Sequence, residues 1–467
     1  MKKSFLHEAY ITSNAEKKHE KVIFEITPEH IIVGFSGSPK PLELIPLGCR
    51  SIHLPQFNEE EFSVSIKQEP LFELPLVWSY KHDIPGILHS ILLSVYEKTL
   101  LLDSRSVKVI VVESNLPRPI KSILSQVFLQ RLMVPAITFL PSSVMSLLTL
   151  GLMSGITIEI GTQESTITPV YDGRHLETCT YSSSVGENMV IRNLKSELKI
   201  HGFYRFAEKK GSDANERLKL DDSILDKDLC EFILINALVA SPLSPPHDLV
   251  LPKSTIHQLG MSHTVDDPLT QWFVQSSISA DFEVMWANEK HGIILVNIPG
   301  WVRERILEVI FYGDTGNDIY GIAPLLSKCL KSLPVDLRRN LSKRILITGK
   351  LADIPNFKNR VVGDLASLLA ADERWRNLAN DIGLADAPVA LSSEETNKNS
   401  TSLKGSDPHS DDFSLNPALE ESSTKKIQTY SNSGILFPSA SRAWIGASIA
   451  TAAGIGGTEI SSVNSYF

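Results

Sequence analysis

The sequence predicts an α/β protein with two similar lobes, and three observations support this. Residues 107–150 alternate strand, helix, strand and helix, which is the pattern of a sheet covered by helices. Residues 22–35 and residues 156–171 each read as two strands joined by a short turn. Because one such hairpin occurs early in the chain and the other follows the strand–helix series at 107–150, we expect two related lobes, each built around its own hairpin.

The first hairpin is predicted from the apolar runs 22–26 and 31–35, which flank a turn that contains Pro28. Residues 107–113 read VKVIVVE, an almost continuous apolar run that is typical of a central strand covered on both faces. The spacing of apolar residues predicts further elements around this strand. They are helices at 85–101, 119–132 and 143–150 and a strand at 136–140.

The second hairpin is predicted from the alternating strand 156–160, a turn at 161–164 and a strand at 165–171. Beyond it the pattern is less regular, and the stretch 203–290 is the hardest to interpret. The expected elements are helices at 187–198, 227–240, 266–285, 301–312, 324–330 and 358–369, a strand at 344–349 and a further element at 293–299.

Composition excludes several classes of protein. A net charge of −9 argues against nucleic acid as a partner, since phosphate binding needs a basic face. The uncharged window 132–158 contains prolines and glycines, so we expect buried strands and helices there and no membrane span. The first residues lack an apolar signal core, which indicates a cytosolic or nuclear protein. Four scattered cysteines predict free thiols (Cys49, Cys179, Cys230, Cys329), and the histidines His30, His82 and His175 show no metal-ligand spacing.

Several short motifs resemble the actin family. Residues 169–173 read PVYDG, residues 34–37 read GFSG and residues 443–450 read AWIGASIA, each similar to a motif of actins. Residues 141–151 read PSSVMSLLTLG, which is most similar to the actin-related proteins at the pointed end of dynactin. The resemblance implies the actin-like two-lobed ATPase fold, here with a degenerate nucleotide pocket.

The resemblance also implies a division of the chain into lobes. Residues 391–426 are dominated by Ser, Thr, Asn, Asp and Glu and are too polar to offset their chain entropy by burial. Because the AWIGASIA motif follows this segment, we expect an insertion within a folded lobe. The expected parts are a flexible N-terminus at 1–21, a first lobe at 22–150 with a satellite region at about 38–80, a second lobe at 151–385, a disordered insertion at 386–426 and a segment at 427–467 that returns to the first lobe.

The first hairpin has lost the residues that an actin-type ATPase uses. Such an enzyme needs glycine-rich turns whose N–H groups hold phosphates, together with aspartates that hold Mg²⁺ through water. By resemblance, Glu25 stands at the acid position. Residues 26–29, ITPE, replace the glycine-rich turn, so that Pro28 removes a donor and Glu29 adds a negative charge. Ile32 stands at the position of the phosphate-binding lysine.

The second hairpin and the adenosine side are changed as well. Glu159 replaces the aspartate, and only Gly161 of the turn matches, since Thr162 and Gln163 follow it. Ser142 and Thr166 stand at the positions of the residues that orient water in actins. Residues 349–352 stand at the position of the turn that binds adenosine, and Asp226 and Lys227 stand at the position of the pair on the adenine side. Two interpretations of Glu25 and Glu159 are open. We favour solvated acids in turns, and the alternative is that both bind water molecules of a hydrated Mg²⁺ ion. The remnant pocket positions are thus Glu25, Glu159, Gly161 and Gly349.

These losses predict a non-catalytic structural subunit with no catalytic residues, no metal and no expected cofactor, and we expect ATP to bind weakly or not at all. By resemblance it would cap the pointed end of the actin-like filament in dynactin, the cofactor of dynein in microtubule transport. Its partners would be the adjacent actin-like protomer and other pointed-end subunits, and its location the cytoplasm and cytoskeleton. Residues 56–70 are acidic and lack the loop by which actins contact the next subunit. The alternatives are a nuclear actin-related subunit of a chromatin remodeller and a weak actin-type ATPase.

Overall fold

The fold is described from a computed structural model of the chain. It describes residues 21–27, 30–46, 48–52, 66–70, 84–114, 116–206, 217–246, 268–288, 292–314, 319–386 and 438–462. The chain divides into two units, one formed by residues 1–385 with 437–467 and the other by residues 386–436. Apart from Asp386, the second unit lies outside the described residues, and the predicted insertion at 386–426 lies there with it.

The first lobe is built on a five-stranded sheet with the strand order β3-β2-β1-β6-β7. β1 is antiparallel to β2 and parallel to β6, and β6 is parallel to β7. Alternate residues of β1 point to opposite faces of the sheet, so Phe24 packs with the helices α3 and α4 while Ile23 packs with α5 and α15. The strands are β1 (Lys21–Ile26), β2 (His30–Phe35), β3 (Glu43–Pro46), β6 (Lys108–Glu113) and β7 (Ile137–Pro141), and the helices are α3 (Ile84–Ser94), α4 (Arg118–Gln126), α5 (Ser142–Leu148) and α15 (Arg442–Ala452).

The second lobe repeats the arrangement of the first around another sheet. Its strand order is β10-β9-β8-β18, with β8 antiparallel to β9 and parallel to β18, and β11 pairs with β9. Both lobes therefore contain a hairpin whose first strand also pairs with a parallel strand from later in the chain. The elements are β8 (Gly155–Ile160), β9 (Ser165–Tyr171), β10 (Arg174–His175), β11 (Tyr181–Ser183), β18 (Ile345–Thr348), α6 (Glu187–His201), α11 (Ile322–Ser332), α12 (Val335–Ser342) and α13 (Phe357–Ala370).

A smaller sheet extends the second lobe, and it corrects one prediction. Its strand order is β13-β12-β15-β14. The expected helix at 266–285 is too long, because α8 (Pro268–Ser276) ends before β14 (Phe282–Asn288), whose seven residues all pair with β15 (Gly292–Ile298). The alternation of buried and exposed residues in β14 is that of a strand. The other elements here are β12 (Phe203–Phe206), β13 (Leu218–Lys219) and α7 (Lys227–Asn236).

The single helix expected at 301–312 is also wrong, because two helices occupy this stretch, α9 (Gly300–Arg305) and α10 (Glu308–Tyr312). The side-chain amide of Asn193 donates to the Ile306 carbonyl at 2.9 Å, and the Ile310 N–H donates to Leu307 instead. The helical bond pattern is therefore interrupted by a residue from α6. The remaining elements are β4 (Gly48–Ile52), β5 (Ile66–Pro70), β16 (Gly313–Asp314), β17 (Ile319–Tyr320), α14 (Arg376–Ala379), the π-helices Val95–Leu100 and Val127–Arg131, and the 3-10 helices Ser104–Ser106, Glu177–Cys179, Lys350–Asp353 and Ser439–Ser441.

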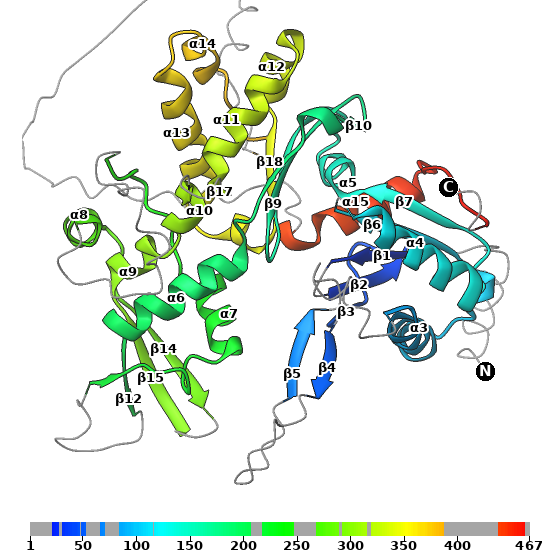
Figure 1. The fold of residues 1–467 in the computed structure, drawn as a ribbon, viewed down its shortest axis with the longest axis horizontal. Helices are drawn as coiled ribbons and strands as arrows, with labels where there is room; N and C mark the ends of the chain where they lie inside the picture. Colours follow the sequence, from blue (N-terminus) through cyan, green and yellow to red (C-terminus); the bar gives the residue numbers. More distant parts are fainter. Residues whose placement is uncertain are drawn as a thin grey trace, which may run out of the picture. The chain divides into compact units, whose positions relative to one another are not determined.

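The C-terminal helix α15 packs on the first lobe against α5 and β1 (Figure 1). Trp444 is completely buried, and its indole Nε1–H donates to the Ile23 carbonyl at 3.2 Å. Gly446 allows the two helices to approach closely, since a Cβ there would lie 1.8 Å from the Met145 carbonyl oxygen. As the sequence predicted, Trp444 belongs to the core.

Among the described residues, no helix has the length and apolar character needed to cross a membrane. Cys179, Cys230 and Cys329 are buried free thiols, as the sequence predicted. Burial raises the pKa of Cys230 to about 11. The Cys230 thiol therefore remains protonated at neutral pH and behaves as a small apolar side chain of the core.

Candidate functional site

Two glutamates occupy matching positions in the two lobes. Glu25 is the last residue but one of β1, and Glu159 is the last residue but one of β8. In the parallel partner strands, Glu25 pairs with Val112 and Glu159 pairs with Thr348. The two carboxyl groups are close enough that the charge of Glu159 raises the pKa of Glu25. The structure therefore brings the two predicted acid positions into one site.

Glu159 is held by hydroxyl groups of the first lobe. Its Oε1 accepts a hydrogen bond from Ser142 at 2.6 Å, and its Oε2 accepts one from Ser114. Burial raises the pKa of the Glu159 carboxyl, and these two hydroxyl donors oppose that shift. Both serines come from the first lobe, at the end of β6 and the start of α5, so this carboxylate connects the two lobes.

Glu25 has a different environment. Burial and, to a smaller extent, the negative charge of Glu159 raise its pKa, a hydrogen bond from the backbone N–H of Trp444 lowers it, and the net pKa is about 8. Its Oε2 is buried and has no hydrogen-bond partner. Glu25 is therefore mostly protonated at pH 7. Because both acids lie within strands and are partly buried, the expectation of solvated turn acids is wrong.

The turn of the first hairpin is closed by its own hydrogen bonds. The N–H and the hydroxyl of Thr27 both donate to the His30 carbonyl at 3.0 Å, and the His30 N–H donates to the Thr27 hydroxyl at 3.0 Å. Ile32, at the position of the expected phosphate-binding lysine, is buried in the core. Pro28 and Glu29 lie outside the described residues. The backbone donor of Thr27 is thus directed into the turn.

The turn of the second hairpin is also internally bonded. The Gly161 N–H donates to the Glu164 carbonyl at 2.9 Å. The carbonyls of Gly161 and Thr162 accept from the first N–H groups of α6, those of Glu187 at 3.0 Å and Asn188 at 2.8 Å. A helix N-terminus can bind anions because its first N–H groups lack partners. Here the turn itself supplies those partners.

The segment that matches the adenosine turn contacts the same region. Gly349 has φ +103°, and a Cβ there would lie 2.2 Å from the Ile160 carbonyl oxygen, so this position requires glycine. The next residue, Lys350, lies with its Nζ 3.2 Å from Glu187 Oε2. The cation at this turn is therefore paired with an acid of α6.

The residues expected on the adenine side have local structural contacts. Asp226 is the N-cap of α7 and accepts from the Leu229 N–H at 2.7 Å. Lys227 lies 3.7 Å from Glu231, one helical turn further on. Thr166, at the position of a water-orienting residue, is buried in β9 and pairs with Glu159 in β8.

Sequence reasoning identified Glu25, Glu159, Gly161 and Gly349 but missed Ser114. The signal that would have found it is its position directly after β6, since strand ends in such sheets gather at one edge. Among the described residues, no group of three His, Cys, Asp or Glu side chains is arranged to hold a metal ion.

Comparison with known proteins agrees with this architecture. Residues 86–228 match the family model described as actin. A relative from Arabidopsis thaliana, "Actin-related protein 4", is 24% identical over 266 residues, which cover 55% of this chain and 57% of that protein. The match thus spans little more than half the length of the relative. The chain has the actin-like two-lobed fold, and these matches support an actin-related protein.

Proposed function

We propose that the chain is a non-catalytic, actin-related structural subunit. The observation that carries this proposal is the chemistry of the two hairpins. At the two acid positions that the resemblance implies, Glu25 and Glu159 are buried carboxyl groups, and burial raises the pKa of each. The described turn atoms of Thr27 and Gly161 are bonded within the protein. Phosphoryl transfer needs free backbone donors and cations at these places.

The contacts of Glu159 support a lobe connection that needs no nucleotide. In a nucleotide-binding fold of two lobes, the ligand contacts both lobes and so connects them. Here the hydroxyls of Ser114 and Ser142 in the first lobe reach Glu159 in the second. Asp353 in the second lobe likewise accepts from the Ser439 hydroxyl at 2.6 Å, just before α15. These bonds are part of the chain and persist without a ligand.

The assembly that we propose is the pointed end of dynactin, where the subunit would terminate the actin-like filament and support dynein-based transport. The stretch at 141–151 supports this choice by its resemblance to the pointed-end proteins, and it forms the helix that packs against α15. The composition of residues 56–70 supports a terminal position, because a filament grows only when two complementary faces are present.

Nucleotide binding tests the non-catalytic part of the proposal. Isothermal titration of the full chain with Mg–ATP at pH 7 should show weak binding or none, and no phosphate release should exceed that of a buffer control. Muscle actin serves as the positive control. A dissociation constant below about 10 μM, equivalent to roughly 7 kcal/mol, would contradict the proposal.

Sedimentation and partner identification test the structural part. At micromolar concentration the chain alone should form no regular filaments when salt is added, and sedimentation with electron microscopy checks this. A tagged chain recovered from cells should copurify with the actin-like filament protein and the pointed-end subunits of dynactin. Recovery with a chromatin-remodelling complex instead would select the alternative assembly.

A further inference from the structure

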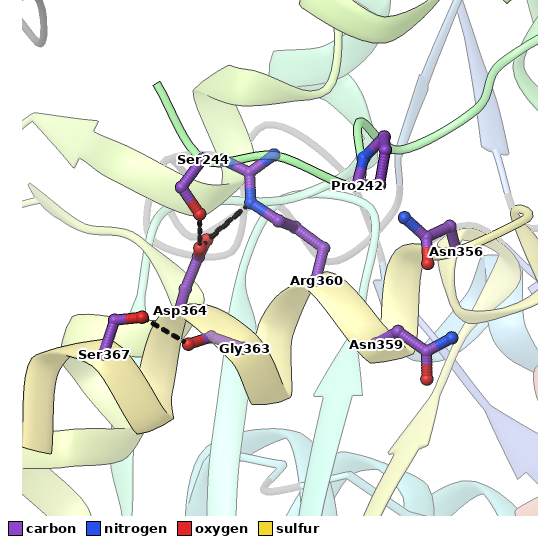
Figure 2. A pocket seen from close by; sticks show the side chains of 8 residues that line it. All are labelled: Pro242, Ser244, Asn356, Asn359, Arg360, Gly363, Asp364 and Ser367. Atoms are coloured by element: carbon purple, nitrogen blue, oxygen red, sulfur yellow. Dashed lines mark hydrogen bonds and ion pairs between the residues drawn. The ribbon is translucent and has the colours of Figure 1, made fainter. Parts of the chain in front are cut away.

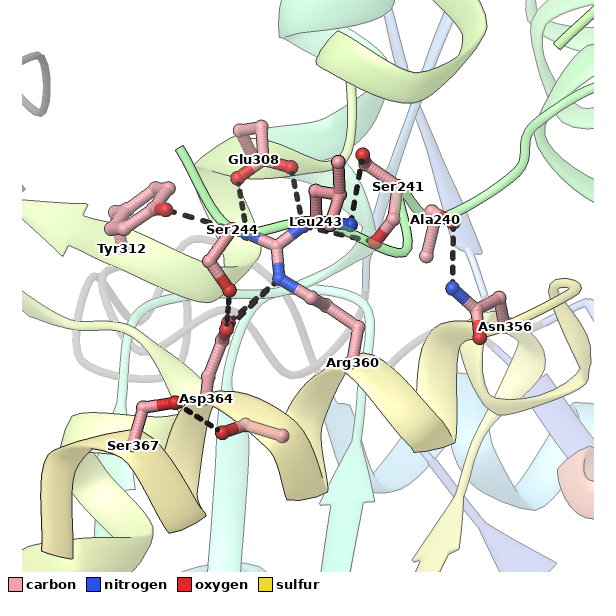
Figure 3. Close-up of polar contacts among 11 residues, drawn as sticks. Ala240, Ser241, Leu243, Ser244, Glu308, Tyr312, Asn356, Arg360, Asp364 and Ser367 are labelled. Carbon is pink, nitrogen blue, oxygen red and sulfur yellow. Dashed lines mark hydrogen bonds and ion pairs between the residues drawn. The ribbon is translucent and has the colours of Figure 1, made fainter. Parts of the chain in front are cut away.

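A second polar site in the second lobe surrounds Arg360 of α13. A guanidinium group has five N–H donors, and Figure 3 shows that all of them are engaged. Nε donates to Asp364 at 3.0 Å, Nη1 donates to the Ser241 carbonyl at 3.1 Å and to Glu308 at 2.9 Å, and Nη2 donates to Glu308 at 2.9 Å and to the Tyr312 hydroxyl at 3.3 Å. Arg360 therefore has no donor left for an external anion.

The charge of Arg360 is shared between two carboxyl groups. Burial works against its positive charge, but the attraction of Glu308 and the hydrogen bonds to it outweigh burial and raise the pKa of the guanidinium. Asp364 adds a second acid, and its side chain is 12% exposed, whereas that of Glu308 is 5% exposed. The Ser244 hydroxyl also donates to Asp364. A carboxylate can accept about four hydrogen bonds, so Asp364 keeps acceptor capacity on the exposed side.

A pocket of about 210 Å³ lies beside this network (Figure 2). We call it the α13 pocket, and its walls include Pro242, Ser244, Asn356, Asn359, Gly363 and Asp364. The hydroxyls of Ser244 and Ser367 donate to atoms of the protein, to Asp364 and to the Gly363 carbonyl. The amide of Asn356 donates to the Ala240 carbonyl at 3.1 Å. These donors of the pocket wall are therefore used within the protein, and the two charged residues that line the pocket are Arg360 and Asp364.

The volume of the α13 pocket limits what it can hold. Pockets for cofactors and other small-molecule ligands usually measure about 300–1,000 Å³. A cavity of about 210 Å³ is smaller than that range but has room for one long side chain. Side chains of this kind, when they enter a pocket, often dominate the binding energy of a protein–protein contact.

Gly363 leaves part of the wall of the α13 pocket without a side chain. It lies in the middle of the 14-residue helix α13, where glycine costs about 1 kcal/mol relative to alanine. A Cβ at this position would meet no atom within 4 Å, and the backbone is not in the left-handed region. Neither packing nor backbone conformation therefore requires glycine. Its effect is to leave one wall of the α13 pocket open.

We propose that the α13 pocket receives the cationic side chain of a lysine or arginine from a partner subunit. The inference deepens the proposed structural role and rests on it, because it names the chemistry of one partner contact. Asp364 is the residue that would accept the cation, with the side-chain amides of Asn356 and Asn359 at the rim. An anionic partner group is disfavoured, since every donor of Arg360 is used.

Saturation-transfer NMR on the full chain tests this site with three peptides: acetyl-Gly-Lys-Gly-amide, acetyl-Gly-Arg-Gly-amide and acetyl-Gly-Glu-Gly-amide, at millimolar concentration. Side-chain protons of the lysine and arginine peptides should receive saturation, whereas those of the glutamate peptide should not. Gly363→Leu should fill the cavity and reduce the signals at least fivefold without lowering the melting temperature. Gly456→Leu is the matched control, since a Cβ there also meets nothing within 4 Å, and it should leave the signals unchanged.

A second variant keeps the experiment decisive if Gly363→Leu does not fold. Asp364→Asn keeps the shape of the side chain and removes its charge, so it should weaken the lysine and arginine signals even if Gly363→Leu is unstable. Equal signals from the glutamate peptide, or undiminished signals in both variants, would overturn the proposal. Spermidine that binds tenfold more tightly than either cationic peptide would also overturn it, in favour of a free polyamine. Tight ATP binding together with intact peptide binding would refute the proposed function alone.

Discussion

The β1–β2 hairpin of the first lobe and the β8–β9 hairpin of the second have the same topology, but their glutamates differ in hydrogen bonding. In each, the first strand pairs with a parallel strand from later in the chain and carries a glutamate one residue before its end. Glu159 accepts from two serine hydroxyls, whereas the Oε2 of Glu25 is buried without a partner. The same position thus holds a hydrogen-bonded carboxylate in one lobe and a mostly protonated acid in the other.

The difference shows how two buried acids at matching positions of the two lobes can share one site. Two buried carboxylates side by side repel one another, and protonation of one relieves that repulsion. Burial raises the pKa of Glu25 to about 8, and the charge of Glu159 contributes to this. Glu159, with its two hydroxyl donors, is the better site for the remaining negative charge. The pair can therefore persist at neutral pH without a cation.

Among the substitutions that test the difference between the two hairpins, Glu25→Gln should change the free energy of unfolding most. Because the folded state raises the pKa of Glu25 from 4.5 to about 8, the wild type should lose stability as pH rises through this window. A glutamine side chain cannot ionise, so the Glu25→Gln variant should be spared that loss. We expect its free energy of unfolding, relative to wild type, to rise by about 3 kcal/mol between pH 5 and pH 8.5.

Urea unfolding of both proteins at the two pH values measures this difference. The exposed acid Glu164 in the second hairpin provides the control variant Glu164→Gln. If Glu25→Gln and wild type respond to pH in parallel, Glu25 is ionised in the folded protein, and the two hairpins are more alike than the structure indicates.

Removal of the hydroxyls around Glu159 should have the next largest effect. Ser142→Ala deletes a buried donor to the carboxylate and should reduce the free energy of unfolding by about 2 kcal/mol at pH 8. Ser114 is exposed, so Ser114→Ala should cost about 1 kcal/mol. Because both act on one carboxylate, a double-mutant cycle should show coupling. Strict additivity would mean that the two serines do not share Glu159.

The smallest of the three effects concerns the first turn. Thr27→Val keeps the branched shape of the side chain but removes both of its hydrogen bonds to His30, so it should cost about 1 kcal/mol. In the second hairpin, Thr162→Val serves as the counterpart, because the turn there is closed by backbone bonds. We expect that variant to stay within about 0.5 kcal/mol of wild type. Thermal unfolding that ranks the two variants the other way would contradict this account of the turns.

The sequence predicted the parts of the fold that depend on local patterns. Both hairpins and the strand at 107–113 follow from alternating or continuous apolar runs, and β1, β2, β6, β8 and β9 occupy these places. The helix at 143–150 is found as α5, Ser142–Leu148. Local spacing was sufficient here because each element buries a regular face in the core.

The parts that depend on distant residues could not be predicted. The break between α9 and α10 requires Asn193, which lies 113 residues before Ile306. The buried pair of Arg305 and Glu197, 108 residues apart at 2.9 Å, has no signature in either helix alone. The sequence around Ser114 gives no sign of its hydrogen bond to Glu159, because Glu159 lies in a distant strand, β8. In each case the relevant partner becomes evident only from the tertiary structure.

The position of α15 has a consequence for the order of events during synthesis. Trp444 closes one face of β1 by packing over Ile23, 421 residues earlier in the chain, and Ile460 pairs with Ile137 at the sheet edge. At about 5–20 residues per second, a ribosome needs roughly 20–80 s to translate the residues between β1 and α15. The first strand made is thus among the last to have both faces covered. The apolar face of β1 that Trp444 covers is therefore completed only after α15 has been translated.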